Sequence, residues 1–148
     1  MQSQSYRVVL DTNEVVGAGT GWLDHGIPAS DTNTHRRILI RVAESHTGLY
    51  SGKIVGEYLE KIVDLGHPRE RALKLMTYIM GAFSQVTITT TSAPVPPADP
   101  DDEIFLLCAI DGDADYLVSE DKHLTAIKGS YTKPVIGKSG ELAEALGA

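Results

Sequence analysis

Three aspartates stand where a chain of alternating strands and helices usually places its functional side chains. Asp11 follows the apolar segment YRVVL at 6–10, and Asp121 comes shortly after YLV at 116–118. Asp102 precedes the apolar run at 104–110, which is typical of a buried helix. Because parallel strands end along one edge of a sheet, Asp11 and Asp121 are expected to be neighbours.

Clustered carboxylates predict a particular kind of chemistry. Carboxylates that lie close together raise one another's pKa unless a cation compensates their charge. Oxygen ligands of this kind suit Mg²⁺ or Mn²⁺, and no spacing of His or Cys residues indicates a zinc site. Carboxylates that bind metal, without a covalent nucleophile, indicate activation of water against a phosphodiester.

The elements that must position these residues alternate along the whole chain. Apolar and β-branched segments predict strands at 6–10, 48–50, 86–89, 116–118 and 134–136. A short helix is expected within 14–31, and it leads into a polar loop. Helical spacing and capping residues predict further helices that start near Asp31 or Thr32, after Ser51, at Pro68, at Asp101 and after Ser139. A helical turn is expected at 123–127. The proline-rich segment 90–99 is expected to be a surface loop. Strands alternating with helices predict a single domain over 1–148, a three-layer α/β/α fold with a parallel sheet of four or five strands.

Composition narrows the class of protein. A net charge of −7 argues against a protein that coats nucleic acid through bulk positive charge. The apolar runs are too short to span a membrane, and the N-terminus has no secretory pattern. The single cysteine, Cys108, lies in the apolar run and is expected to fill the core. A lone cysteine favours a reducing compartment, so we expect a cytoplasmic protein.

Three segments together resemble the PIN-domain nucleases. VVLDTN at 8–13 resembles the opening strand and first acid of that family, and YSGKIVGEYLEKI at 50–62 resembles its second segment. DPDDEIFLLCAIDGDADYLVSEDKHL at 99–124 resembles the segment that carries the third and fourth acids. The chain is similar to bacterial PIN proteins classed as toxin components of toxin–antitoxin pairs, relatives of the VapC-type toxins.

The resemblance implies a site of four acids that are catalytic and bind Mg²⁺ or Mn²⁺: Asp11, Glu57, Asp102 and Asp121. It assigns Glu57 to the site, whereas the helical pattern alone places that residue on the surface. Asp101 could replace Asp102, but the spacing to the apolar run favours Asp102. Asn13 and Ser119 match positions that support the site through hydrogen bonds.

The implied function is a metal-dependent endoribonuclease that acts on single-stranded or structured RNA. The same resemblance implies a homodimer and an antitoxin partner. The alternative is a catalytically inactive PIN-like module that binds RNA or a partner protein. Phosphatases of the haloacid dehalogenase type and receiver domains both need a further acid near the first one. Here Asn13 stands two residues after Asp11, which disfavours both of these classes.

Two positions depart from the family pattern. Glu14 replaces an apolar residue, and His123 stands where an acid is common. The segment 17–33 has no familiar pattern. Arg36, Arg37 and Arg41 form a basic group that either contacts phosphates or is a solvated helix face.

Overall fold

A five-stranded parallel sheet forms the centre of the protein. The computed structural model describes residues 4–19 and 33–148. The strands lie in the order β3-β2-β1-β4-β5, and all neighbouring pairs are parallel. Their bounds are β1 Arg7–Leu10, β2 Thr47–Tyr50, β3 Ser84–Gln85, β4 Tyr116–Val118 and β5 Val135–Gly137. Strand β1 is central: Val9 pairs with Leu49 on one side and with Leu117 on the other.

Seven α-helices connect and cover the strands. They are α1 Thr12–Gly19, α2 Thr34–Ser45, α3 Gly52–Asp64, α4 Arg69–Ala82, α5 Glu103–Asp111, α6 Lys122–Thr125 and α7 Ser139–Leu146, with 3₁₀ turns η1 at Pro100–Asp102 and η2 at Lys128–Ser130. Within the described residues the expected α/β/α domain with a parallel sheet is therefore confirmed, with five strands.

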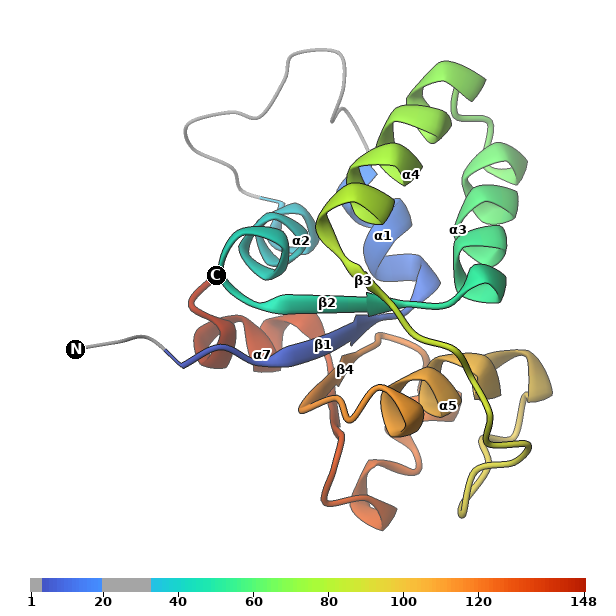
Figure 1. The fold of residues 1–148 in the computed structure, drawn as a ribbon, viewed down its shortest axis with the longest axis vertical. Coiled ribbons are helices and arrows are strands. Elements are labelled where there is room, and N and C mark those ends of the chain that lie inside the picture. The colour runs from blue at the N-terminus through green and yellow to red at the C-terminus, as the bar shows by residue number, and fades with distance from the viewer. Residues whose placement is uncertain (1–3, 20–32) are drawn as a thin grey trace.

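The strand order determines which helices share a face. The chain runs outward from β1 to β2 and β3, and then returns past β1 to β4. Because such crossovers are right-handed, the helices before β3 and the helix α5 after it cover opposite faces of the sheet. Helix α5 contacts β1, β2 and β4, whereas α2 packs against α1, α4 and α7. In Figure 1, α3 and α4 form a hairpin above β2, and α5 lies below β1.

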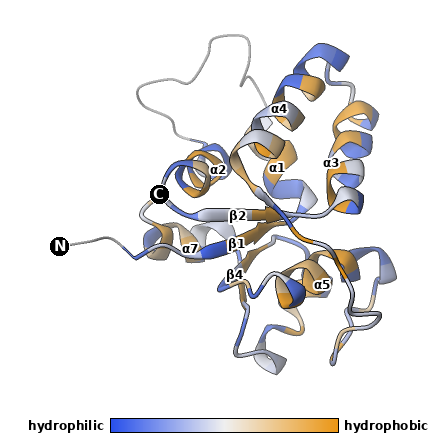
Figure 2. Ribbon diagram, viewed as in Figure 1, coloured by the Kyte–Doolittle hydropathy of each residue, from blue (hydrophilic) through white to orange (hydrophobic). Residues whose placement is uncertain are grey.

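The core follows the apolar pattern of the sequence. Strand β1 ends in three buried residues, and α5 buries Phe105, Leu106, Leu107, Cys108 and Ala109. Figure 2 shows α5 as largely hydrophobic, while α3 and α4 carry hydrophobic residues on only part of their surface. Burial raises the pKa of the Cys108 thiol to about 12, so this residue fills the core, as predicted, and is not a nucleophile.

Two helix starts were predicted closely. The side chain of Ser51 accepts a hydrogen bond from the Ile54 amide at the start of α3. Asn33 caps α2 in the same way through the Arg36 amide, so the cap lies one or two residues after the predicted one. The predicted polar loop falls largely on 20–32, outside the described residues.

Two predicted elements were wrong in detail. The segment 86–89 is not a strand: β3 comprises Ser84–Gln85, and pairing ends with the Val86 amide, which donates to the Tyr50 carbonyl at 2.7 Å. Ser139 does not cap α7, because Lys138 holds the cap position and the Ser139 hydroxyl donates instead to Glu120. The end of β3 and the cap of α7 both depend on contacts with distant residues, and local propensity does not contain this information.

The described part of the chain contains no helix with the length and apolar character that a membrane crossing requires.

Candidate active site

The predicted acids gather where the strand order reverses. Strands β1 and β4 are neighbours in the sheet, but the segments that follow them run to opposite faces of the sheet. Ligands of open α/β sheets bind at such a point, outside the carboxyl ends of the strands. Asp11 follows β1, and Ser119 to Asp121 follow β4, so both segments meet there.

Asp11 is buried and held by two hydrogen bonds. Its side chain is one of few buried carboxylates in the described residues, with 3% of its surface exposed. Oδ2 accepts from the Ser119 hydroxyl at 2.6 Å, and Oδ1 accepts from the Thr12 amide at 2.7 Å. Burial raises the pKa of Asp11, the two hydrogen bonds lower it, and the Asp121 charge raises it further, with a net upward shift.

Ser119 connects Asp11 to Asp121. The Asp121 amide donates to the Ser119 hydroxyl oxygen at 3.0 Å, while that hydroxyl donates to Asp11. Asp121 also caps α6, because its Oδ1 accepts from the His123 amide at 2.7 Å. The first bond fixes the Asp121 backbone between β4 and α6, and the second fixes one oxygen of its carboxylate.

Asp102 faces the other two aspartates from the start of α5. It ends the 3₁₀ turn Pro100–Asp102, and its Oδ2 is buried without a hydrogen-bond partner. Burial, followed by the charges of Asp121 and Asp11, raises the pKa of Asp102 to about 7. We call Asp11, Asp102 and Asp121 the aspartate cluster.

Glu57 does not join the aspartate cluster. It lies exposed in the second turn of α3. Its pKa is raised by partial burial and then by Glu60 and Asp101, and not by any member of the cluster. Glu57 is thus exposed and within reach of the charge of Asp101, whereas Asp102 has a buried carboxylate oxygen.

The two predicted supporting residues differ in what they contact. Ser119 is fully buried and bonds to Asp11, as described above. Asn13 is exposed in the first turn of α1. The structure therefore gives Ser119 a supporting contact with the aspartate cluster and places Asn13 on the surface.

A second group of ionisable side chains, outside the predicted set, lies at the same end of the sheet. Glu14, His35 and Glu120 each place one ligand atom within 4.8 Å of the others, and among the described residues no other group of three or more Asp, Glu, His or Cys residues does so. We call these residues the glutamate–histidine cluster. The sequence signal for it was the acid at position 14, where an apolar residue was expected; the partners of Glu14 carried no signal.

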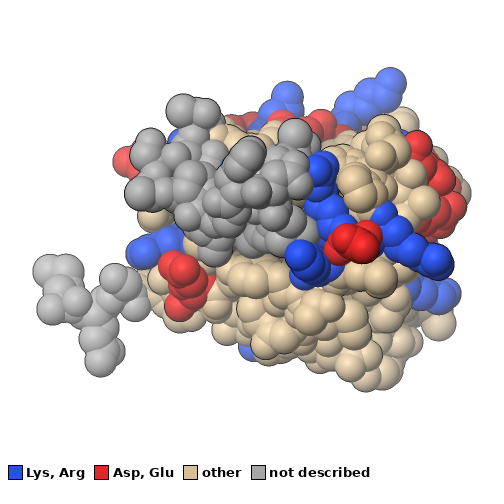
Figure 3. Space-filling view, turned by 90° about the horizontal axis from the view of Figure 1, so that it is seen from above, with Lys and Arg blue, Asp and Glu red and all other residues tan. Residues whose placement is uncertain are grey.

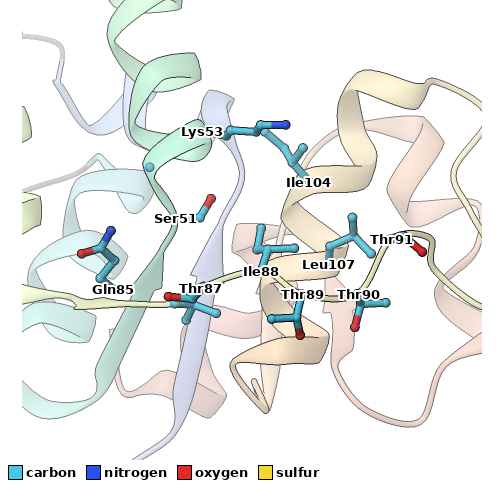
Figure 4. A pocket seen from close by; sticks show the side chains of 12 residues that line it. Ser51, Lys53, Gln85, Thr87, Ile88, Thr89, Thr90, Thr91, Ile104 and Leu107 are labelled. Atoms are coloured by element: carbon cyan, nitrogen blue, oxygen red, sulfur yellow. The ribbon is translucent and has the colours of Figure 1, made fainter.

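An open cleft of about 570 Å³ lies beside α5. Its walls come from the start of α3, from segment 86–91 and from Ile104 and Leu107 of α5. Figure 4 shows Lys53 and Ile104 at one side of the cleft and four threonines along segment 87–91 at the other. Ile104 follows Asp102 by two residues, so the cleft adjoins the element that carries this acid.

The basic group on α2 is largely engaged in contacts within the protein. Arg36 Nε donates to the Ala18 carbonyl at 3.2 Å, and Arg41 Nε donates to the Leu146 carbonyl at 3.3 Å. In the face shown in Figure 3, Lys and Arg side chains are interspersed with Asp and Glu. These contacts favour a structural role for Arg36 and Arg41 over a phosphate-binding surface.

The sequence was compared with models of protein families and with known proteins. The model described as the PIN domain matches residues 7–123, which is well over half of the chain. The chain belongs to the PIN domain family. A search of curated proteins gave no match.

A solved structure of similar fold supports the same architecture. It is a chain of the crystal structure of VapBC2 from Rickettsia felis bound to a DNA fragment from their promoter. The two chains are 14% identical, the TM-score is 0.57, and the match covers 89% of this PIN domain protein and 97% of the other chain. At this identity the likeness shows the fold alone. PIN domains are generally nucleases and typically use divalent metals, so membership makes a nuclease the expected class for this chain.

Proposed function

We propose that this PIN domain protein is an endoribonuclease that depends on Mg²⁺ or Mn²⁺, with Asp11, Glu57, Asp102 and Asp121 as its catalytic, metal-binding acids. The observation that carries the proposal is the buried Oδ2 of Asp102, which has no hydrogen-bond partner and faces the charges of Asp11 and Asp121. No Lys, Arg or His among the described residues forms an ion pair with these three aspartates. A divalent cation would supply the missing positive charge, and oxygen ligands alone suit Mg²⁺ or Mn²⁺.

The protein's own contribution is to hold the carboxylates in place. Ser119 and the Thr12 amide fix both oxygens of Asp11, and the His123 amide fixes one oxygen of Asp121. Asp102 presents its buried oxygen from the opposite side. A cation bound there would polarise the scissile phosphate and lower the pKa of an attacking water. Glu57 is exposed on α3 and would contribute the fourth acid from outside the aspartate cluster.

The alternative is a PIN-like module that binds RNA or a partner without cutting. It would be favoured if one of the acids were missing, but all four are present in the chain. Cleavage distinguishes the two functions, because binding alone leaves the RNA intact.

The test is cleavage of a generic single-stranded RNA by purified protein in Mg²⁺, in Mn²⁺ and in EDTA. We expect cleavage in both metals, none in EDTA, and none by Asp11→Asn. The control is Asp64→Asn, because Asp64 is an exposed acid at the end of α3. Cleavage in EDTA, or equal cleavage by Asp11→Asn and Asp64→Asn, would overturn the proposal, and selective cleavage of DNA would replace RNA as the substrate.

We also propose that the chain is a toxin that forms a homodimer and is inhibited by an antitoxin. The support is the similar fold in the VapBC2 structure, together with large hydrophobic side chains that stay about half exposed on the α3–α4 hairpin: Val63, Leu65, Leu73 and Met80. Exposed apolar residues grouped on one pair of helices are typical of protein interfaces.

Light scattering should give twice the chain mass, and expression should be toxic unless the adjacent gene is co-expressed. A monomer would contradict the first point, and harmless expression of an active nuclease would contradict the second.

A further inference from the structure

Glu14, His35 and Glu120 come together from three separate elements. Glu14 lies in α1, His35 in α2, and Glu120 in the segment after β4. His35 Nδ1 lies 2.7 Å from Glu14 Oε2, and one ligand atom from each residue lies within 4.8 Å of the other two. Two carboxylates and one imidazole thus converge on a single point.

Glu14 is the most unusual member of the cluster. Its side chain has 1% of its surface exposed, and its Oε1 is buried without a hydrogen-bond partner. A buried carboxylate oxygen that no donor reaches is costly unless a cation or a proton occupies the space beside it. The imidazole of His35 carries at most one positive charge, so the second carboxylate needs either a proton shared between Glu14 and Glu120, which interact through a hydrogen bond, or a bound cation.

Two of the three side chains, those of Glu120 and His35, have contacts outside the cluster that limit their movement. Glu120 Oε1 accepts from the Ser139 amide at 2.9 Å and from the Ser139 hydroxyl. The His35 ring packs against Gly17, where a Cβ atom would lie 2.8 Å from His35 Cδ2. A larger residue at position 17 would therefore displace the His35 ring from this position. Groups held in place by surrounding contacts in this way are typical of metal ligands.

We propose that Glu14, His35 and Glu120 bind one transition-metal ion, with Zn²⁺ as the matching ion. An imidazole nitrogen with two carboxylates is a donor set that suits Zn²⁺ better than Mg²⁺, which prefers oxygen ligands and water. The aspartate cluster has oxygen ligands only, so the two sites select different metals.

The proposed ion would connect the segments that carry the aspartate cluster. Glu14 lies one helical turn after Asp11, and Glu120 directly precedes Asp121. A metal that joins α1 to the segment after β4, and both to α2, would stabilise the end of the sheet where the aspartates lie. This second site does not depend on the proposed ribonuclease activity.

The test uses the full chain after removal of metal with EDTA and dialysis. Zn²⁺ binding is measured by titration calorimetry in an Asp102→Asn background, which weakens the aspartate cluster as a competing site. We expect one equivalent of Zn²⁺ to bind, and Glu14→Gln and His35→Asn to weaken this binding by about tenfold or more. His67→Asn is the matched control, because His67 lies in the turn between α3 and α4.

Co²⁺ gives a second readout, since its visible absorption reports ligand type and geometry. The Co²⁺ spectrum should change in His35→Asn and not in His67→Asn. Circular dichroism shows whether each variant is folded. Because the His35 side chain is one-third exposed, its substitution removes a proposed ligand without changing the buried core. Absence of Zn²⁺ binding, or equal binding by His35→Asn and His67→Asn, would overturn the proposal.

Discussion

The aspartate cluster and the glutamate–histidine cluster occupy the same end of the sheet but are built differently. The first contains only oxygen ligands, and its member Asp102 is half-buried. The second is tighter, includes a nitrogen ligand, and contains the almost fully buried Glu14. Consecutive residues contribute to both: Ser119 and Asp121 belong with Asp11, whereas Glu120 bonds to Ser139.

If both proposals hold, one strand end contributes residues to two metal sites. Successive residues of an extended segment point in opposite directions, so the residues after β4 alternate between the two clusters. A more open, oxygen-only site suits a hard ion and a substrate that must enter and leave. A closed site with mixed ligands suits a structural ion.

The largest expected effect is on cleavage. Asp11→Asn should lower the rate of metal-dependent RNA cleavage by about a hundredfold or more, because it removes a charged ligand that Ser119 and Thr12 hold in place. Glu14→Gln, in the other cluster, should lower it far less. Initial rates at saturating Mg²⁺ measure both. Equal losses in the two variants would mean that the clusters act as one site.

The next effect is on stability as a function of pH. The pKa of Asp102 is raised from its ordinary 3.8 to about 7, so the folded protein binds a proton more tightly than the unfolded chain. Without metal, stability should therefore fall as pH rises from about 4 to about 7, and Asp102→Asn should flatten this dependence. Urea unfolding in EDTA across this range is the measurement. A slope that is unchanged in the variant would show that Asp102 titrates normally.

Glu57 should behave differently from the aspartates. Glu57→Gln should impair cleavage, yet change the metal-free stability by no more than about 0.5 kcal/mol, because Glu57 is exposed and lies apart from the cluster. Cleavage rates and urea unfolding of the same preparation measure the two quantities. Full activity of Glu57→Gln would remove this residue from the catalytic set.

The smallest effect concerns the cleft beside α5. We expect the phosphates of a bound RNA to follow this cleft, because Lys53 lines it and it adjoins the helix that begins beside Asp102. Lys53→Gln should then reduce the salt dependence of single-stranded RNA binding by about 0.7 in the slope of log K against log salt. Arg41→Gln, which loses its bond to the Leu146 carbonyl, should change stability rather than this slope. An unchanged slope for Lys53→Gln would exclude the cleft as the path of the phosphates.

The sequence predicted the parts of the site that follow from local pattern. The apolar segments before Asp11 and Asp121 identify two strands, and the run after Asp102 identifies a buried helix. With parallel topology, these features predict that the three acids meet. Glu57 was assigned only through the PIN-domain resemblance, and in the structure it is exposed, with no charge of the aspartate cluster acting on it.

The parts that depend on packing between distant elements could not be predicted. Glu14 meets His35 where the absence of a side chain at Gly17 leaves room for the His35 ring, and Glu120 is held by a serine that the sequence indicated as a helix cap. Likewise, Val86–Thr89 has the composition of a strand, but pairing at the sheet edge ends at Val86. Such outcomes are decided by which partner lies within reach, and local composition does not contain that information.

The central claim is that Asp11, Asp102 and Asp121 form one cation site. Asp121 raises the pKa of both Asp11 and Asp102, so its charge opposes folding when no metal is bound. A bound metal reverses this by stabilising the folded state in proportion to RT ln(1 + [L]/Kd).

The most direct test is therefore a pair of thermal melts, in EDTA and in Mn²⁺, for wild type and Asp121→Asn. The variant should melt at a higher temperature than wild type in EDTA, because repulsion is relieved, and should gain less from Mn²⁺. If Asp121→Asn melts lower than wild type in EDTA and gains as much from Mn²⁺, the three aspartates do not share a site.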